Sequence, residues 1–208
     1  MCIFKPCFET GKFIFLEKED KKPEVTHRIT RETVVEFRLL RKGALFIFIG
    51  VHLLYLGVYV LCWGHHNMWR ELLDFAGWFI WLFVPSVLLH EGLHGLVWAV
   101  PSNWRHIRFG FNVSLMAPYT HCTVPLAKWH YFSGAITPAV LMGVLPAVYA
   151  LCKGNLQLLY WGLVYTWASA GDFISCWYVL KEKNNTRILD HPETLGYYVC
   201  SPEEEGKH

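Results

Sequence analysis

Four long apolar stretches dominate the pattern of hydrophobic and polar positions along the chain. They cover residues 43–63, 75–100, 131–151 and 156–180. Each is close to or above the ~20 residues that an α-helix needs to cross the hydrocarbon core of a bilayer. The pattern therefore predicts an all-α membrane protein with about four transmembrane helices.

The polar residues between the second and third apolar stretches show a different pattern. Residues 107–113 alternate between apolar and polar or small side chains, and glycine and proline punctuate the loop. Alternation with a period of two is typical of strands, so we expect a short cytoplasmic β-hairpin or re-entrant element here. The edge of such a strand would hold an extended peptide through main-chain hydrogen bonds. An ordinary connecting loop is the alternative.

The two ends of the chain are polar. We expect a short strand at residues 13–16 and, after Thr30 as N-cap, a basic helix over residues 31–42. The chain then divides into a cytoplasmic N-terminal segment (1–42), a membrane domain (43–180) and a cytoplasmic tail (181–208).

Composition and charge support this organisation. Of 208 residues, 53% are hydrophobic and only 17% charged, which is too apolar for an ordinary soluble protein of this size. The net charge of +2 hides an asymmetry, because two of the predicted loops hold only Arg70 and Lys153 as basic residues. The other polar segments are rich in lysine and arginine, so the positive-inside rule places both termini in the cytoplasm. We expect lipid around the protein and no nucleic-acid partner.

The second apolar stretch contains the motif His90-Glu91-Gly92-Leu93-His94. On a helix, residues four positions apart face the same way, so both imidazoles can reach one metal ion. Glu91 then lies beside the first histidine, where it can take a proton from a metal-bound water without binding the metal itself. Two ordinary buried histidines are the alternative interpretation.

A catalytic zinc ion normally has three protein ligands and one open position. Glu91 and Asp172 are the only carboxylates in the four apolar stretches. Inserting a charged side chain at the centre of a membrane helix costs about 2.5–3.5 kcal/mol on insertion scales. Each of these two carboxylates is therefore expected to have a functional role. The second and fourth stretches would run in the same direction, which places His94 and Asp172 at a similar depth, roughly 10–13 Å inside the cytoplasmic end. Asp172 is therefore the predicted third ligand.

The chain resembles a bacterial membrane family of unknown function described as zincin peptidases, and is more distantly similar to the site-2 proteases, which are intramembrane zinc enzymes. The resemblance is carried by HEGLH and by four further segments: Ser133-Gly134-Ala135-Ile136-Thr137-Pro138, Ser169-Ala170-Gly171-Asp172, Asp190-His191-Pro192 and Gly196-Tyr197-Tyr198. It implies zinc bound by His90, His94 and Asp172, with Glu91 as catalytic acid and base. One departure is that glycine precedes the aspartate here, whereas site-2 proteases usually carry Leu-Asp-Gly.

These observations predict a zinc-dependent metallopeptidase that cleaves a peptide or membrane protein within the bacterial cytoplasmic membrane or at its cytoplasmic face. Glu91 would accept a proton from the water and return it to the leaving amine. Asn112 or His121 of the central loop would supply a further donor to the substrate.

Two alternatives remain open. A catalytically silent metal-binding membrane protein or a transporter would not need Glu91 as a proton acceptor. A di-iron oxygenase is suggested by the other histidines of the chain, but it needs them clustered on one side of the membrane. The predicted topology separates them into two groups: His65 and His66 on one side, and His106, His121 and His130 on the other.

Overall fold

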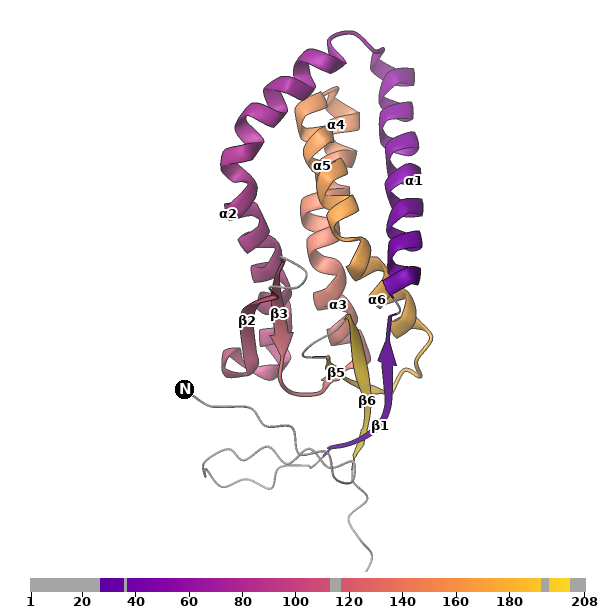
Figure 1. Cartoon of the computed structure of the whole chain (residues 1–208), viewed down its shortest axis with the longest axis vertical. Helices are drawn as coiled ribbons and strands as arrows, with labels where there is room; N and C mark the ends of the chain where they lie inside the picture. The colour runs from indigo at the N-terminus through magenta and orange to yellow at the C-terminus, as the bar shows by residue number, and fades with distance from the viewer. Residues whose placement is uncertain (1–26, 36, 113–116, 192–194, 203–208) are drawn as a thin grey trace, which may run out of the picture.

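Helices form most of the structure, a computed structural model that describes residues 27–35, 37–112, 117–191 and 195–202 (Figure 1). Three continuous helical runs in these residues are long and apolar enough to cross a membrane. They are α1 (Phe37–Trp63), α2 (Met68–Ser102) and the run formed by α3 (Lys128–Pro138), the π-helix η2 (Ala139–Val144) and α4 (Leu145–Lys153). The prediction of a mostly helical protein is thus confirmed, and these three runs are consistent with a membrane protein.

The fourth apolar stretch forms two short helices where one spanning helix was expected. α5 (Leu156–Ala168) and α6 (Ala170–Leu180) are separated at Ser169, and neither reaches the ~20 residues of a span. Ser169 and Gly171 are poorer helix formers than the residues around them, and serine is favoured at the start of a helix. The break at Ser169 therefore places Asp172 in the first turn of a new helix.

The helices pack around α5 in the upper part of the bundle of Figure 1. A core cluster joins Tyr59 of α1, Phe75 of α2 and Leu159 of α5. Gly162 of α5 lies against α4, where an added Cβ would come within 2.7 Å of the Ala147 backbone nitrogen. Small residues at such contacts let membrane helices approach closely.

A four-stranded antiparallel sheet closes one end of the bundle. Its order is β1 (His27–Val34), β6 (Gly196–Pro202), β5 (Arg187–Asp190) and β4 (Leu126–Ala127). The all-α prediction missed this sheet, because β1 pairs with a segment at the opposite end of the chain. The helix predicted over residues 31–42 begins only at Phe37, and the strand predicted at 13–16 lies outside the described residues.

A separate antiparallel pair follows α2, in the segment where the sequence predicted a hairpin. After the short helix η1 (Trp104–His106), β2 (Ile107–Asn112) pairs with β3 (Ala117–Cys122). Both strands contact α2. The hairpin and the sheet lie at the same end of the molecule, and the α1–α2 and α4–α5 turns lie at the other (Figure 1).

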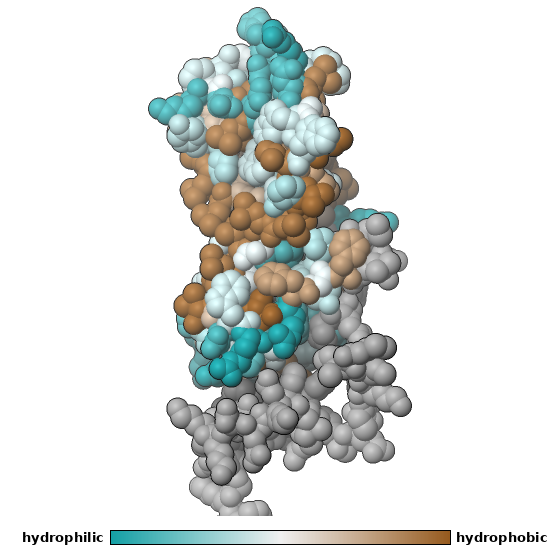
Figure 2. All heavy atoms as spheres, turned by 90° about the vertical axis from the view of Figure 1, so that its left-hand side faces the viewer, coloured by the Kyte–Doolittle hydropathy of each residue, from teal (hydrophilic) through white to brown (hydrophobic). Residues whose placement is uncertain are grey.

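The outer face of α2 is apolar along its middle. Figure 2 shows a brown belt on this face, with teal residues above and below it. Trp81 and Val84 are 81% and 62% exposed, and Ile80, Phe83 and Leu88 are also exposed. An apolar surface of this extent marks an interaction with lipid or protein, which fits a helix that faces lipid.

Candidate metal centre

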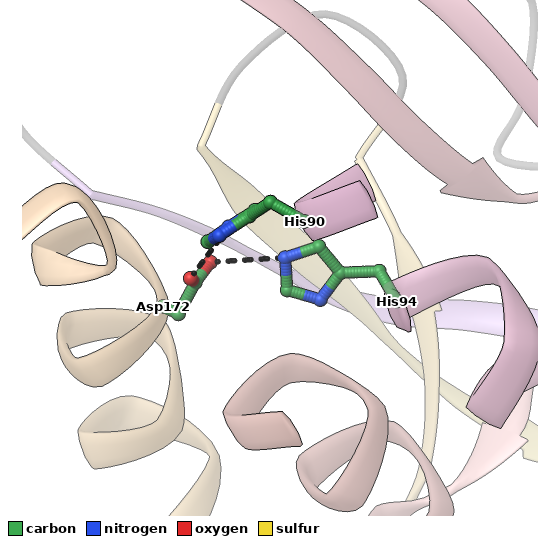
Figure 3. A group of neighbouring side chains, drawn as sticks. All are labelled: His90, His94 and Asp172. Carbon is green, nitrogen blue, oxygen red and sulfur yellow. Dashed lines mark ion pairs between the residues drawn. The ribbon is translucent and has the colours of Figure 1, made fainter. Parts of the chain in front are cut away.

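Two helices bring the predicted metal-binding side chains together. His90 and His94 project from one face of α2, and Asp172 lies in the first turn of α6 (Figure 3). His90 Nε2 is 3.3 Å from Asp172 Oδ2, and His94 Nε2 is 3.5 Å from Asp172 Oδ1. The ligand atoms of all three residues lie within 4.8 Å of one another. This group has the size of a site for a single ion.

The group is largely buried. The side chains of His90, His94 and Asp172 are 12%, 8% and 21% exposed. Asp172 Oδ2 is inaccessible and has no hydrogen-bond partner among the described residues, although it lies at ion-pair distance from His90. A buried carboxylate oxygen without a donor needs a compensating cation.

The hydrogen bond of His94 defines which of its ring nitrogens is free. His94 Nδ1 lies 2.8 Å from the backbone oxygen of Gly134. A carbonyl only accepts, so Nδ1 carries the hydrogen and the neutral ring presents the lone pair of Nε2 to Asp172. That lone pair and the carboxylate repel each other unless a cation lies between them. Two imidazole nitrogens and one carboxylate are a donor set typical of catalytic zinc, so the residues fit this metal.

The break between α5 and α6 explains the position of Asp172. Ser169 and Asp172 have the spacing of a capping box, in which serine would bind the amide of residue 172. The Ser169 side chain makes no such bond, and Asp172 is directed at the two imidazoles. Its carboxylate also lies near the positive end of the α6 dipole. Asp172 is therefore placed to act as a metal ligand.

Glu91 is held by the hairpin. The Thr120 hydroxyl of β3 lies 2.9 Å from Glu91 Oε2 and 2.8 Å from the backbone oxygen of Glu91. Its single hydrogen can serve one of these acceptors at a time. When that hydrogen serves Oε2, the hydroxyl holds the Glu91 carboxylate beside the metal-binding group. No sequence motif pointed to Thr120, because its contact exists only when β3 packs on α2.

Of the two predicted substrate-binding residues, the structure shows a side-chain partner for His121 and describes only the backbone of Asn112. His121 Nδ1 is 3.0 Å from Asp190 Oδ2 in β5, and the Tyr131 hydroxyl donates to Asp190 Oδ1 over 2.8 Å. His121 therefore has a partner in the sheet. Asn112 pairs through its backbone position with Ala117 at the end of β2, and its side chain lies outside the described part. A substrate-binding role for either residue stays a prediction.

The other histidines form no second metal-binding group within the described ranges. His65 and His66 stack on each other at the α1–α2 turn, with ring centroids 5.0 Å apart. The only set of three or more metal-binding side chains found in the described residues is His90, His94 and Asp172. This arrangement does not favour the di-iron alternative.

Comparison with known families identifies the family of this chain. The model of a family described as "DUF3267: Putative zincin peptidase" matches residues 82–187, which is just over half of the chain. The matched range begins in α2 and ends in β5, so it includes the three clustered side chains and Glu91. No curated protein and no solved structure matches the sequence significantly. The similarity to site-2 proteases is not shown by these comparisons.

Proposed function

Because the chain belongs to the family described as "Putative zincin peptidase", we propose that it is an integral membrane zinc metalloprotease that hydrolyses peptide bonds. The observation that carries this proposal is the convergence of His90, His94 and Asp172, two imidazoles and a partly buried carboxylate, around the space for one cation. Glu91, next to His90 in the chain, supplies the proton acceptor that hydrolysis needs.

The roles of the side chains follow from the geometry. His90 and His94 would hold the metal through Nε2, and Asp172 through a carboxylate oxygen. When bound, zinc supplies the Lewis acidity that activates a water molecule and polarises the scissile carbonyl. Glu91 accepts the proton of that water and delivers it to the leaving amine. Thr120 keeps the Glu91 carboxylate oriented for both transfers.

The location of the site indicates the kind of substrate. His90 and His94 lie in the C-terminal half of α2, a helix whose apolar length suffices to cross a membrane and which is followed in the chain by β2. We therefore assign cleavage to the membrane or its cytoplasmic face, with a membrane protein or a peptide as substrate. Within the described residues β2 and β3 pair only with each other, so an extended substrate can add to the hairpin next to Glu91.

The substitution Glu91→Gln tests the proposal. The wild type and the variant are expressed in host cells that lack the endogenous gene, and both are purified for zinc analysis. We expect equal zinc content, because Glu91 is not a ligand, and loss of newly formed peptide termini in membranes from the variant cells. Quantitative mass spectrometry of protein termini measures that loss.

The outcomes separate the candidate functions. Termini that depend on the wild-type carboxylate support hydrolysis. The same termini in both samples, with zinc bound equally, would leave a catalytically silent metal-binding protein or a transporter. A wild-type protein without zinc or another transition metal would reject the metal centre itself.

A further inference from the structure

The Gly134 carbonyl group is free to bind His94 because residue 138 is a proline. In an α-helix the backbone oxygen of residue 134 accepts a hydrogen bond from the amide of residue 138. Residue 138 is proline, which has no amide hydrogen, and the next amide, that of Ala139, donates to Ile136. The Gly134 oxygen is left without its usual helical donor and accepts from His94 Nδ1 over 2.8 Å.

The burial of this region explains why the Gly134 oxygen and the His94 ring bind each other. α3 belongs to a helical run apolar enough to span the membrane, and His94 and Pro138 are both buried. A backbone oxygen at such a place has no water to bind and must find a donor within the protein. The His94 ring needs an acceptor for the same reason. Each group therefore satisfies the other.

The packing between α2 and α3 brings these groups within reach. A Cβ atom at residue 134 would overlap the Trp98 indole, so only glycine allows this approach. Trp98 stacks on the His94 ring, with centroids 5.5 Å apart and an interplanar angle of 22°, and donates its Nε1 hydrogen to the Tyr131 oxygen over 3.0 Å. The ring of His94 is thus held on one side by stacking and at its edge by a hydrogen bond.

We propose that Pro138 is a positioning residue of the metal centre: by withholding an amide hydrogen, it reserves the Gly134 carbonyl for His94 and so orients Nε2 toward Asp172. This inference rests on the proposed zinc function. Outer partners of metal-binding histidines fix the tautomer and the ring orientation, and their loss typically lowers metal affinity by about 10–100-fold. An amide at residue 138 would compete with His94 for the same oxygen.

A matched pair of substitutions isolates that amide. Pro138→Ala introduces the hydrogen, whereas Pro138→lactic acid, incorporated as an α-hydroxy acid, has the same methyl side chain with an ester oxygen in place of N–H. The purified full-length proteins are titrated with zinc against a chromophoric chelator. We expect about 10–100-fold weaker binding for the alanine variant and near wild-type binding for the lactic acid variant. Equal weakening in both would overturn the proposal, because the loss would then come from proline's shape.

Two further proteins complete the design. Pro146→Ala is the control, because Pro146 lies in the same helical run eight residues after Pro138, and its substitution should leave the zinc dissociation constant unchanged. His94→Nδ-methylhistidine removes the donor while Pro138 stays in place, which keeps a test available if the alanine variant does not fold. It should weaken zinc binding by a similar factor, and the two changes combined should not add. Full affinity in the methylated protein would refute the role of the hydrogen bond.

The zinc affinity of the wild type separates this inference from the proposed function. If the wild type does not bind zinc, the metal centre itself is wrong. If the wild type binds zinc and the Pro138→Ala variant binds it equally well, only the role of Pro138 is wrong.

Discussion

A largely buried carboxylate that has an oxygen without a hydrogen-bond donor is unstable unless a cation compensates its charge. Asp172 is in this position, so zinc should stabilise the fold as well as serve the reaction. We expect a chelator to lower the melting temperature of the wild type, since zinc at about 1,000 times its dissociation constant contributes about 4 kcal/mol. In Asp172→Ala the chelator should have little effect, and the zinc content should fall. Thermal unfolding in detergent with and without chelator measures the stabilisation, and metal analysis measures the zinc content. Unaltered zinc content in the variant would remove Asp172 from the ligand set.

Thr120 has one contact that bears on the reaction, namely its hydrogen bond with Glu91. Thr120→Val keeps the shape of the side chain and removes the hydroxyl. Since hydrogen bonds to charged groups contribute about 1.5–3 kcal/mol, we expect at least about ten-fold slower cleavage with zinc content unchanged. Thr120→Ser restores the hydroxyl and should recover most of the rate. A valine variant as active as the wild type would show that Glu91 needs no such partner.

The sequence predicted the parts of the site that depend on local geometry. The spacing of His90 and His94 alone determines that they share a helix face. Asp172 could be predicted as the third ligand because Glu91 is the only other carboxylate in the apolar stretches. Thr120 was not predictable in this way. Its role arises from packing between segments far apart in the chain, which hydrophobic periodicity does not encode.

At the scale of elements, Asp190 of β5 links the hairpin to the four-stranded sheet and to α3. This carboxylate accepts hydrogen bonds from His121 of β3 and Tyr131 of α3. We expect Asp190→Ala to destabilise the protein by about 1–3 kcal/mol, because both partners lose their acceptor in a partly buried place. Denaturant unfolding in detergent measures the change.

The control for Asp190 is Asp74→Ala. Asp74 is 56% exposed and lies 3.9 Å from Arg70, so its loss should change the stability by less than about 0.5 kcal/mol. Equal stability of the two variants would mean that Asp190 does not connect the hairpin to the sheet.

The fourth apolar stretch shows what a hydropathy pattern leaves undetermined. Its length and composition predict one helix, and nothing in its apolar content indicates where the helix is interrupted. The interruption at Ser169 lets Asp172 occupy a helix N-terminus inside the bundle. The same limit applies to the four-stranded sheet, because the pairing of β1 with β6 depends on contacts between the two ends of the chain.

At the scale of the whole molecule, the structure has two different ends. The strands occupy one end together with basic residues such as Arg31, Lys183 and Arg187, while the turns between α1 and α2 and between α4 and α5 occupy the other (Figure 1). From the bias of lysine and arginine toward the strand end, we predict that this end faces the cytoplasm. The strands and the metal centre would then lie toward the cytoplasmic side.

Cysteine labelling tests this orientation. Cys152, at the end of α4, is exposed at the turn end, and Lys183→Cys provides an exposed thiol at the strand end. In variants that retain one cysteine each, a membrane-impermeant maleimide should label Cys152 in intact cells, and residue 183 only after permeabilisation. Cys200 is a negative control, because burial raises the pKa of its thiol to about 11 and keeps it un-ionised at neutral pH. The reverse pattern, with residue 183 labelled in intact cells, would place the metal centre near the opposite face of the membrane.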